Sequence, residues 1–210
     1  MHRFRTWYDN HLLPRLLDLA CSLGPIARQR QKIVPQAAGR VLEVGIGTGL
    51  NFAFYERGRL ERLVGVDPAG QMHALARRRS RRAGIPVELL QISAETLPIE
   101  SASIDCVVCT YTLCSIPDPL AALREIRRVL RPGGKFLFAE HGLAPDAAVA
   151  KWQSRLEPYW TNIAGGCHLT RDVPALLREA GFSVKSEAAY IAWPKTLAYN
   201  FWGEAVADQG

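Results

Sequence analysis

A short apolar strand followed by three glycines at alternate positions constrains this chain more than any other segment. Residues 41–51 read Val-Leu-Glu-Val-Gly-Ile-Gly-Thr-Gly-Leu-Asn. Val41, Leu42 and Val44 suit a strand that is buried on both faces, and glycine lets the backbone turn tightly against a ligand where a Cβ would clash. We expect a helix over residues 49–58. This order of strand, glycine loop and helix predicts a binding loop for a nucleotide-type cofactor.

The acidic residue inside this segment restricts the ligand. A dinucleotide fingerprint, Gly-x-Gly-x-x-Gly, would need its third glycine where Leu50 stands. Glu43 places a carboxylate at the loop, which would repel a pyrophosphate and suits a cationic ligand. S-adenosylmethionine (SAM) carries a sulfonium and an ammonium group and no phosphate, so it meets this requirement. The alternative is an ordinary glycine-rich turn without a ligand.

A second carboxylate ends the next apolar run, which spans residues 63–67. Asp67 lies 18 residues after Gly49. A carboxylate at the end of the second strand of such a unit can accept hydrogen bonds from both ribose hydroxyls of a nucleoside. Capping of the following helix is the alternative role. The spacing from the glycine loop favours the ribose role.

Length and composition indicate one domain. The chain has 210 residues, 48% of them hydrophobic, which is enough for a full core. It contains neither an apolar run long enough to span a bilayer nor a signal peptide, and its five cysteines are an odd number. We therefore expect a cytoplasmic protein. Cys106 and Cys109 have Cys-x-x-Cys spacing but lie in an apolar run without a second pair, so we expect core residues and no metal ion.

The formal net charge of +6 is compatible with nucleic acid, an anionic membrane surface or an acidic substrate. The densest basic run, residues 77–82, falls on a helix that we expect over 70–83 and that Gly84 ends. No aromatic residue interrupts this run. A solvated helix face is therefore a better interpretation than a nucleic-acid footprint.

Strands and helices alternate along the chain. We expect strands at residues 41–45, 63–67, 86–91, 104–110 and 135–140, and helices at 49–58, 70–83 and 119–131. Asp118 caps the last of these helices, and Arg131-Pro132-Gly133-Gly134 stops it. The alternation predicts an α/β fold with a doubly wound parallel sheet, whose ligand lies across the carboxyl ends of the strands.

The flanking segments complete a single domain over residues 1–210. After residue 140 we expect a helix at 145–163, a helix that Thr170 caps and Gly181 ends, and strands at 182–190 and 197–206. Residues 1–36 carry apolar side chains at helical spacing, namely Trp7, Tyr8, Leu12, Leu13, Leu16 and Leu17. We expect 1–36 to form a helical lid, 37–141 to form the cofactor-binding core, and 142–210 to supply the acceptor pocket and last strands.

From residue 40 to 141 the chain resembles the class I SAM-dependent methyltransferases. The resemblance rests on motif I (Glu-x-Gly-x-Gly-x-Gly from Glu43), the adenine-loop segment 94–98, the fourth strand 105–110 and the turn 130–135. It implies a mostly parallel, seven-stranded Rossmann-like sheet with an antiparallel C-terminal edge strand. It also implies SAM as cofactor and S-adenosylhomocysteine as product. The cofactor-binding residues that we expect on this basis are Glu43, Gly45, Gly47, Thr48, Gly49, Asn51, Asp67, Pro68, Met72, Ser93, Ala94, Glu95 and Thr110.

Segments 108–115, 139–142 and 165–172 are similar to a narrower branch, which contains thiol S-methyltransferases and ubiquinone-type methyltransferases. Some members of this branch act on phospholipids. Many have Asp where this chain has Ser93, so the carboxylate for the adenine amino group is absent or supplied by Glu95. The membrane helix that precedes the domain in eukaryotic thiol enzymes has no counterpart here, from which we expect a soluble or surface-associated protein.

Methyl transfer from a sulfonium is an in-line displacement, in which alignment alone can supply roughly 7 to 11 kcal/mol. A strong general base is therefore optional. The candidate catalytic residues are His141 at the end of the fifth strand, His168 in a late turn, and Tyr111. Tyr8 and Tyr111 are candidates for orientation. A lone histidine is more often a structural residue than a catalyst. Cys114 and Cys167 could line the acceptor pocket.

The leading hypothesis is a methyltransferase for a small lipophilic acceptor, with a thiol as first choice, acting as a monomer or homodimer. The alternative is a phosphatidylethanolamine N-methyltransferase in peripheral contact with a membrane, which suits the basic charge and the amphipathic N-terminus. An RNA substrate is disfavoured because no RNA-binding module is visible. A noncatalytic SAM-binding protein is the fourth possibility.

Overall fold

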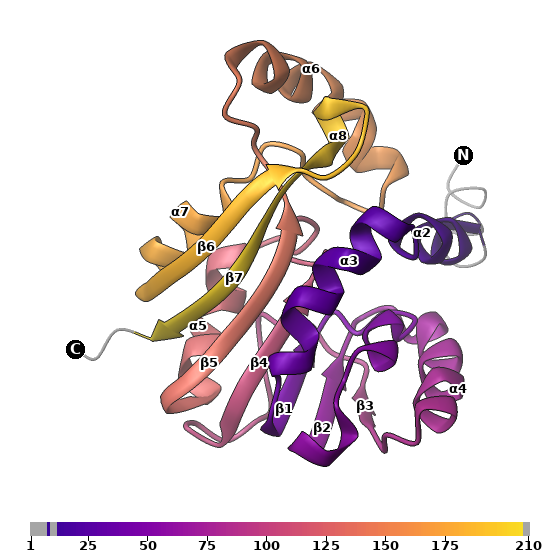
Figure 1. Ribbon diagram of the computed structural model, residues 1–210, viewed down its shortest axis with the longest axis vertical. Helices are drawn as coiled ribbons and strands as arrows, with labels where there is room; N and C mark the ends of the chain where they lie inside the picture. Colours follow the sequence, from indigo (N-terminus) through magenta and orange to yellow (C-terminus); the bar gives the residue numbers. More distant parts are fainter. Residues whose placement is uncertain (1–7, 9–11, 208–210) are drawn as a thin grey trace.

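A seven-stranded sheet forms the centre of the computed structural model, which describes residue 8 and residues 12–207 (Figure 1). The strands are β1 (Gly39–Val44), β2 (Leu60–Val66), β3 (Glu88–Leu90), β4 (Ile104–Thr110), β5 (Leu130–His141), β6 (Phe182–Tyr190) and β7 (Tyr199–Ala207). Their order is β3-β2-β1-β4-β5-β7-β6. β1 to β5 are parallel, and β7 is antiparallel to both of its neighbours. This confirms the predicted mostly parallel, doubly wound sheet with antiparallel C-terminal strands; β7 is inserted, and β6 forms the edge.

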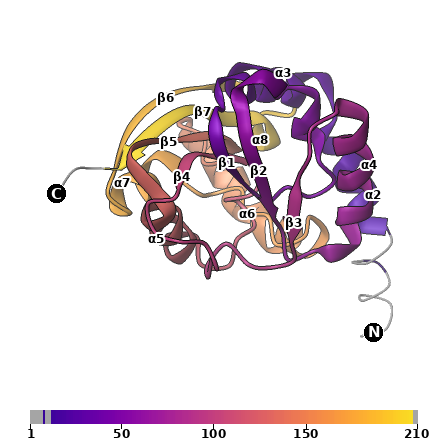
Figure 2. The same ribbon diagram turned by 90° about the horizontal axis from the view of Figure 1, so that it is seen from below.

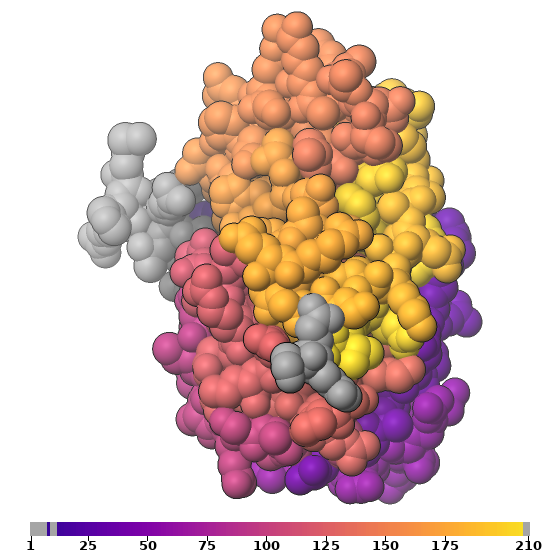
Figure 3. Space-filling view, turned by 90° about the vertical axis from the view of Figure 1, so that its left-hand side faces the viewer, coloured from indigo at the N-terminus to yellow at the C-terminus, as the bar shows by residue number. Residues whose placement is uncertain are grey.

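Helices cover both faces of the sheet (Figure 2). On one face lie α3 (Gly24–Ile33) and α4 (His73–Ala83), and on the other lie α5 (Pro119–Val129) and α7 (Val173–Glu179). The remaining helices, α2 (Leu13–Cys21), α6 (Ala147–Ile163) and α8 (Lys195–Ala198), lie toward the carboxyl ends of the parallel strands. Figure 3 shows that α6 and the residues around it form a lobe at one end of the molecule. No helix within the described residues is long and apolar enough to cross a membrane.

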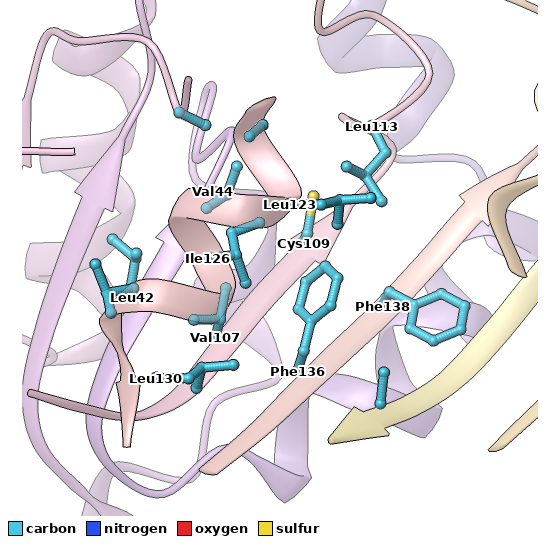
Figure 4. Close-up of a cluster of buried hydrophobic side chains, with 14 of the residues drawn as sticks. Leu42, Val44, Val107, Cys109, Leu113, Leu123, Ile126, Leu130, Phe136 and Phe138 are labelled. Carbon is cyan, nitrogen blue, oxygen red and sulfur yellow. The ribbon is translucent and has the colours of Figure 1, made fainter. Parts of the chain in front are cut away.

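Alternate side chains of the central strands enter two separate cores. Val107 and Cys109 of β4 pack under α5, whereas Cys106 and Val108 face the core that includes α3. Figure 4 shows the first of these cores, in which side chains of α5 pack over those of β1, β4 and β5. Such two-sided burial is what the apolar runs predict for parallel strands. The prediction that Cys106 and Cys109 are core residues is confirmed.

The helix that we expected over residues 49–58 is not present. Two short 3-10 turns, Leu50–Ala53 and Arg57–Arg59, replace it. The physical reason is that Asn51 and Tyr55 both donate hydrogen bonds to the buried carboxylate of Glu43, and these bonds hold the segment against the sheet. The glycine loop thus leads into a tight turn against the sheet.

Capping was predicted correctly at α5 and wrongly at α7. The Asp118 carboxylate accepts the Ala121 N–H at 2.9 Å, as expected. At α7 the cap is Asp172, whose carboxylate accepts the Ala175 N–H at 3.0 Å. Thr170 lies two residues before this cap, and its hydroxyl donates to Glu157 of α6.

Candidate active site

A cavity of about 620 Å³ lies across the carboxyl ends of β1, β2, β4 and β5. This is the edge at which a doubly wound sheet binds its ligand. Residues of α2 and α3 border one side, and α6 together with residues 191–200 borders another. Most predicted cofactor-binding residues line it: Glu43, Gly45, Gly47, Thr48, Asp67, Pro68, Met72, Ser93, Ala94 and Thr110. The other three predicted cofactor-binding residues, Gly49, Asn51 and Glu95, do not line the cavity.

The three glycines of the loop serve different purposes. A Cβ at Gly45 would lie 2.0 Å from Oγ1 of Thr112, and one at Gly49 would lie 2.6 Å from the ring of Phe52. A Cβ at Gly47 would meet no heavy atom closer than 3.6 Å. Gly45 and Gly49 are therefore required by packing inside the protein, whereas a Cβ at Gly47, which lines the cavity, would make only ordinary van der Waals contacts.

Asp67 is held at the cavity by its own backbone surroundings. Its Oδ2 accepts the Gly47 N–H at 2.9 Å and its Oδ1 accepts the Ala69 N–H at 2.8 Å. Burial raises the pKa of this carboxyl group, while the two backbone donors act in the opposite direction. Each oxygen keeps a further lone pair, so the carboxylate can accept two hydroxyl groups. The capping alternative does not describe Asp67, because α4 begins at His73 with Met72 as its cap.

Glu43 holds the loop from inside. It is almost fully buried, and its two oxygens accept hydrogen bonds from Asn51 Nδ2 at 2.9 Å and the Tyr55 hydroxyl at 2.8 Å. Burial raises the pKa of Glu43 to about 7. Because protein donors occupy both of its oxygens, Glu43 positions the glycine loop. Its charge is therefore only partly available to a ligand in the cavity.

Arg30 of α3 lines the cavity, and the sequence analysis did not identify it as a site residue. Its buried guanidinium donates to Asn51 Oδ1 at 2.9 Å and to Thr110 Oγ1, and it lies 5.1 Å from the centre of the Tyr111 ring. The buried Nε atom of Arg30 has no hydrogen-bond partner among the described residues. This cation joins α3 to the ends of β1 and β4, beside the cavity.

The polar group at residues 93–95 faces partly away from the cavity. The Ser93 hydroxyl donates to Glu95 Oε2 at 2.6 Å, and Glu95 Oε1 accepts the Asp118 N–H at 2.8 Å. Ser93 and Ala94 line the cavity, whereas the Glu95 carboxylate is occupied with the start of α5. Glu95 is thus not positioned to replace the missing carboxylate directly.

A charged cluster fastens α2 to the glycine loop. The Asp18 carboxylate accepts hydrogen bonds from both terminal nitrogens of Arg79 at 2.6 and 3.0 Å, and from the Thr48 hydroxyl at 2.5 Å. The hydrogen bond from Arg79 lowers the pKa of Asp18. We name this group the α2 clamp (Asp18, Thr48 and Arg79). Because Leu13, Leu17 and Cys21 of α2 line the cavity, the clamp holds an apolar helix face over it.

The far end of the cavity brings together groups that are remote in sequence. His141 Nε2 lies 2.8 Å from the sulfur of Cys167, and Trp160 Nε1 donates to the same sulfur at 3.3 Å. Hydrogen bonds from the Cys114 thiol and from His141 lower the pKa of Cys167. Burial opposes charge on His141, yet contact with the Cys167 sulfur raises its pKa. Cys167 and His141 therefore share a hydrogen bond at the cavity wall, and the pKa shifts of both groups depend on it.

Two tyrosines considered for orientation lie in different places. The Tyr111 side chain borders the cavity, and its hydroxyl donates to Asn200 Oδ1 of β7 at 2.7 Å. The Tyr8 hydroxyl donates to the Ile163 carbonyl at 2.8 Å, which links the N-terminal segment to α6. Trp7 lies outside the described residues.

His168, which we also considered as a catalytic residue, does not line the cavity. Its Nδ1 lies 2.9 Å from Glu157 Oε1, and the other oxygen of Glu157 accepts the N–H groups of Leu169 and Thr170. These contacts fasten the turn to α6. His141 thus borders the cavity, whereas His168 lies outside it and contacts α6.

A family model described as a methyltransferase domain matches residues 42–138. The human thiol S-methyltransferases TMT1A and TMT1B are 34% and 39% identical to this chain. The TMT1A match covers 86% of this chain and 72% of the relative; the TMT1B match covers 70% and 62%. The chain belongs to the SAM-dependent methyltransferase family. SAM is accordingly its cofactor, in agreement with motif I.

Two further comparisons bear on this methyltransferase. A phosphatidylethanolamine N-methyltransferase of Cereibacter sphaeroides is 37% identical over 57% of this chain and 60% of its own length. The solved structure of a geranyl diphosphate methyltransferase in complex with SAM shares the fold, with a TM-score of 0.67 at 14% identity, over 87% of this chain and 84% of that one. The methyltransferase spans about three fifths of the TMT1B relatives that it matches.

The glycine loop generates a paired prediction. Gly47→Ala and Gly49→Ala share the strain of a positive φ, roughly 1 to 2 kcal/mol. Gly47→Ala should fold and lose most of the thermal stabilisation by S-adenosylhomocysteine, which is about 2.7 kcal/mol for the wild type at 100 times the dissociation constant. Gly49→Ala should have the lower melting temperature, because its Cβ meets Phe52 and Ala76. Thermal unfolding with and without S-adenosylhomocysteine, and with NAD as control, measures both. Full stabilisation of Gly47→Ala would contradict our assignment.

The α2 clamp generates a second prediction. Asp18→Asn leaves Arg79 and Thr48 without their anionic acceptor, and charge-assisted bonds of this kind contribute roughly 1.5 to 3 kcal/mol. We expect S-adenosylhomocysteine to dissociate on the order of 10-fold faster. The matched control is Glu88→Gln, which breaks an exposed ion pair with Arg62 away from the cavity. Equal dissociation rates for Asp18→Asn and wild type in stopped-flow experiments would show that α2 does not retain the cofactor.

Proposed function

We propose that this methyltransferase transfers the methyl group of SAM to the sulfur of a small lipophilic thiol. The observation that carries the proposal is the composition of the acceptor end of the cavity. His141, Cys114 and Cys167 are grouped there, in a wall that is otherwise mostly apolar. The names of the human relatives, both thiol S-methyltransferases, support the same acceptor.

The cofactor would lie along the glycine loop. Asp67 would accept the ribose hydroxyls, Ser93 and Ala94 would border the adenine, and the backbone at Gly47 would border the methionine portion. The sulfonium would then point toward His141, since the cavity continues from the loop to the end of β5. The N-terminal helix α2 would act as the lid over this arrangement.

Methyl transfer from SAM to a thiol requires few catalytic side chains. The thiol sulfur forms a bond to the methyl carbon as the bond between that carbon and the sulfonium sulfur breaks, and the thiol proton leaves. Free thiols have a pKa near 8.5, so a group that accepts the proton at neutral pH increases the reactive fraction. His141 is the group that borders the cavity and can accept it, and alignment supplies much of the remaining rate enhancement.

A second candidate, a phospholipid amine, is favoured by the surface around the cavity. Large apolar side chains are exposed on α2, on α6 and at residue 193, with exposed fractions of 66% for Leu19, 74% for Tyr159 and 87% for Trp193. Leu17, Trp160 and Trp193 on these same elements line the cavity. An apolar rim of this kind suits a lipid surface. It would serve equally for entry of a lipophilic thiol from a membrane.

One comparison separates the two acceptors. The protein is incubated with labelled SAM and, in parallel, with an alkyl thiol, with phosphatidylethanolamine vesicles and with bulk transfer RNA. We expect label in the thiol, at a rate that rises as the pH approaches the pKa of the thiol. Methylation of the lipid alone would overturn the thiol proposal, and a lipid amine would then be the acceptor. Label in RNA alone would overturn both.

Two histidines supply a matched test of the proton acceptor. His141→Ala should lower thiol methylation on the order of 100-fold near pH 7 and much less above about pH 8.5, where the thiolate forms without help. His168→Ala should lower the melting temperature, because Glu157 loses a partner, and leave the shape of the pH profile unchanged. A loss of equal size at every pH for His141→Ala would mean that the residue only shapes the cavity.

A further inference from the structure

Three potential metal ligands converge on the cavity wall. The sulfurs of Cys114 and Cys167 and a ring nitrogen of His141 all lie within 4.8 Å of one another. We propose that these three side chains form a binding site for a zinc ion, with its fourth coordination position open to the cavity. A His141 ring nitrogen that coordinates zinc cannot also accept the thiol proton, so in the zinc-bound protein the metal would replace His141 in activating the thiol. The binding of zinc does not depend on the proposed thiol reaction; only its role in binding the acceptor rests on that function.

The ligand set and its geometry suit zinc. Two cysteines, one histidine and an open position are a known arrangement for catalytic zinc. With Zn–S near 2.3 Å and Zn–N near 2.0 to 2.1 Å, a tetrahedral site needs about 3.5 Å between sulfur and nitrogen and about 3.8 Å between the sulfurs. His141 Nε2 and the Cys167 sulfur are 2.8 Å apart, so they would separate by less than about 1 Å. Small side-chain rotations are sufficient for that change.

The surrounding contacts hold the ligands in place. The His168 N–H donates to the Cys114 carbonyl at 2.8 Å, which ties together the two loops that carry the cysteines. Trp160 Nε1 donates to the Cys167 sulfur at 3.3 Å, an outer contact of the kind that orients metal ligands. His141 is fixed by its place at the end of β5, where it pairs with Asn200 of β7.

The charges near the cluster are compatible with a divalent cation. Two thiolates neutralise the charge of zinc. Two charged groups interact with His141. Glu140 is fully buried and accepts the Thr112 and Leu113 N–H groups, and Arg171 donates to the Leu113 carbonyl. These two opposite charges offset each other.

The open fourth coordination position of the zinc ion would bind the acceptor thiol. All three ligands line the cavity, so a fourth ligand would come from inside it. A thiol that binds there loses its proton to water as the sulfur–zinc bond forms, and it is held as a thiolate. One of the two lone pairs that remain on this sulfur can then attack the methyl carbon of SAM as the bond from that carbon to the sulfonium sulfur breaks, which yields S-adenosylhomocysteine and the thioether. The site would thus select a thiol over an amine by its preference for sulfur.

The experiment measures metal binding directly. Untagged, reduced protein is freed of metal with a chelator, and Zn²⁺ is titrated against a chromogenic indicator. Co²⁺ is added in parallel, because thiolate–cobalt charge-transfer absorption reports the ligand type. The variants are Cys114→Ser, Cys167→Ser and His141→Ala. Cys21→Ser is the control, since Cys21 lines the same cavity but is not part of the cluster.

We expect one zinc ion per chain, a loss of affinity of at least about 100-fold in each of the three variants, and unchanged affinity in Cys21→Ser. Addition of an alkyl thiol to the cobalt-loaded protein should increase the charge-transfer absorption. Absence of zinc binding by the reduced wild type, or binding that survives all three substitutions, would overturn the site. A cobalt spectrum that the alkyl thiol does not alter would overturn its role with the acceptor. Neither result depends on methyl transfer, so failure of the proposed function remains distinguishable.

Discussion

A buried hydrogen-bond network between β1, β4 and α3 holds the cofactor end of the sheet together. Charges placed between two apolar cores are costly unless they are paired and hydrogen-bonded. Here Asn51 Nδ2 donates to Glu43 at 2.9 Å, and Arg30 donates to Asn51 Oδ1 and to Thr110. The positions of the glycine loop and of α3 follow from this one cluster. Because α2 leads directly into α3, the position of α2 over the cavity depends on it as well.

The carboxylates of Glu43, Glu140 and Asp67 have different roles in shaping the cavity. Glu43 holds the loop after β1, and Glu140 accepts the N–H groups of Thr112 and Leu113 and so holds the loop after β4. Both have their oxygens occupied by protein donors. Asp67 differs, because its two backbone donors leave lone pairs for a ligand. Similar residues at neighbouring strand ends thus have different functions, according to how many protein donors each one meets.

The parts of this structure that depend on local pattern were predictable from the sequence. Apolar runs gave the central strands, and the spacing between the glycine loop and Asp67 identified the cofactor edge. The parts that depend on contacts between distant segments were not predictable. Nothing in the sequence shows that Asp18 meets Arg79, 61 residues away, or that Arg30 is buried beside Thr110.

The two histidines illustrate the same limit at the acceptor end. His141 and His168 both follow predicted elements, and only the packing of α6 turns one toward the cavity and the other toward Glu157. Cys114, His141 and Cys167 have no metal-binding spacing, because 27 and 26 residues separate them in sequence. The sheet brings them together. A sequence pattern could at most have marked the strand ends at which they lie.

The insertion of β7 between β5 and β6 has a consequence for synthesis of the chain. During translation β5 is complete long before β7, which begins 58 residues after β5 ends. Until β7 leaves the ribosome, one edge of β5 carries unpaired backbone groups that can pair with another chain. Asn200, the partner of Tyr111 and the register neighbour of His141, arrives with β7. The nascent chain can therefore build its cofactor end first, while the acceptor end and the vulnerable edge are completed together in one late docking step.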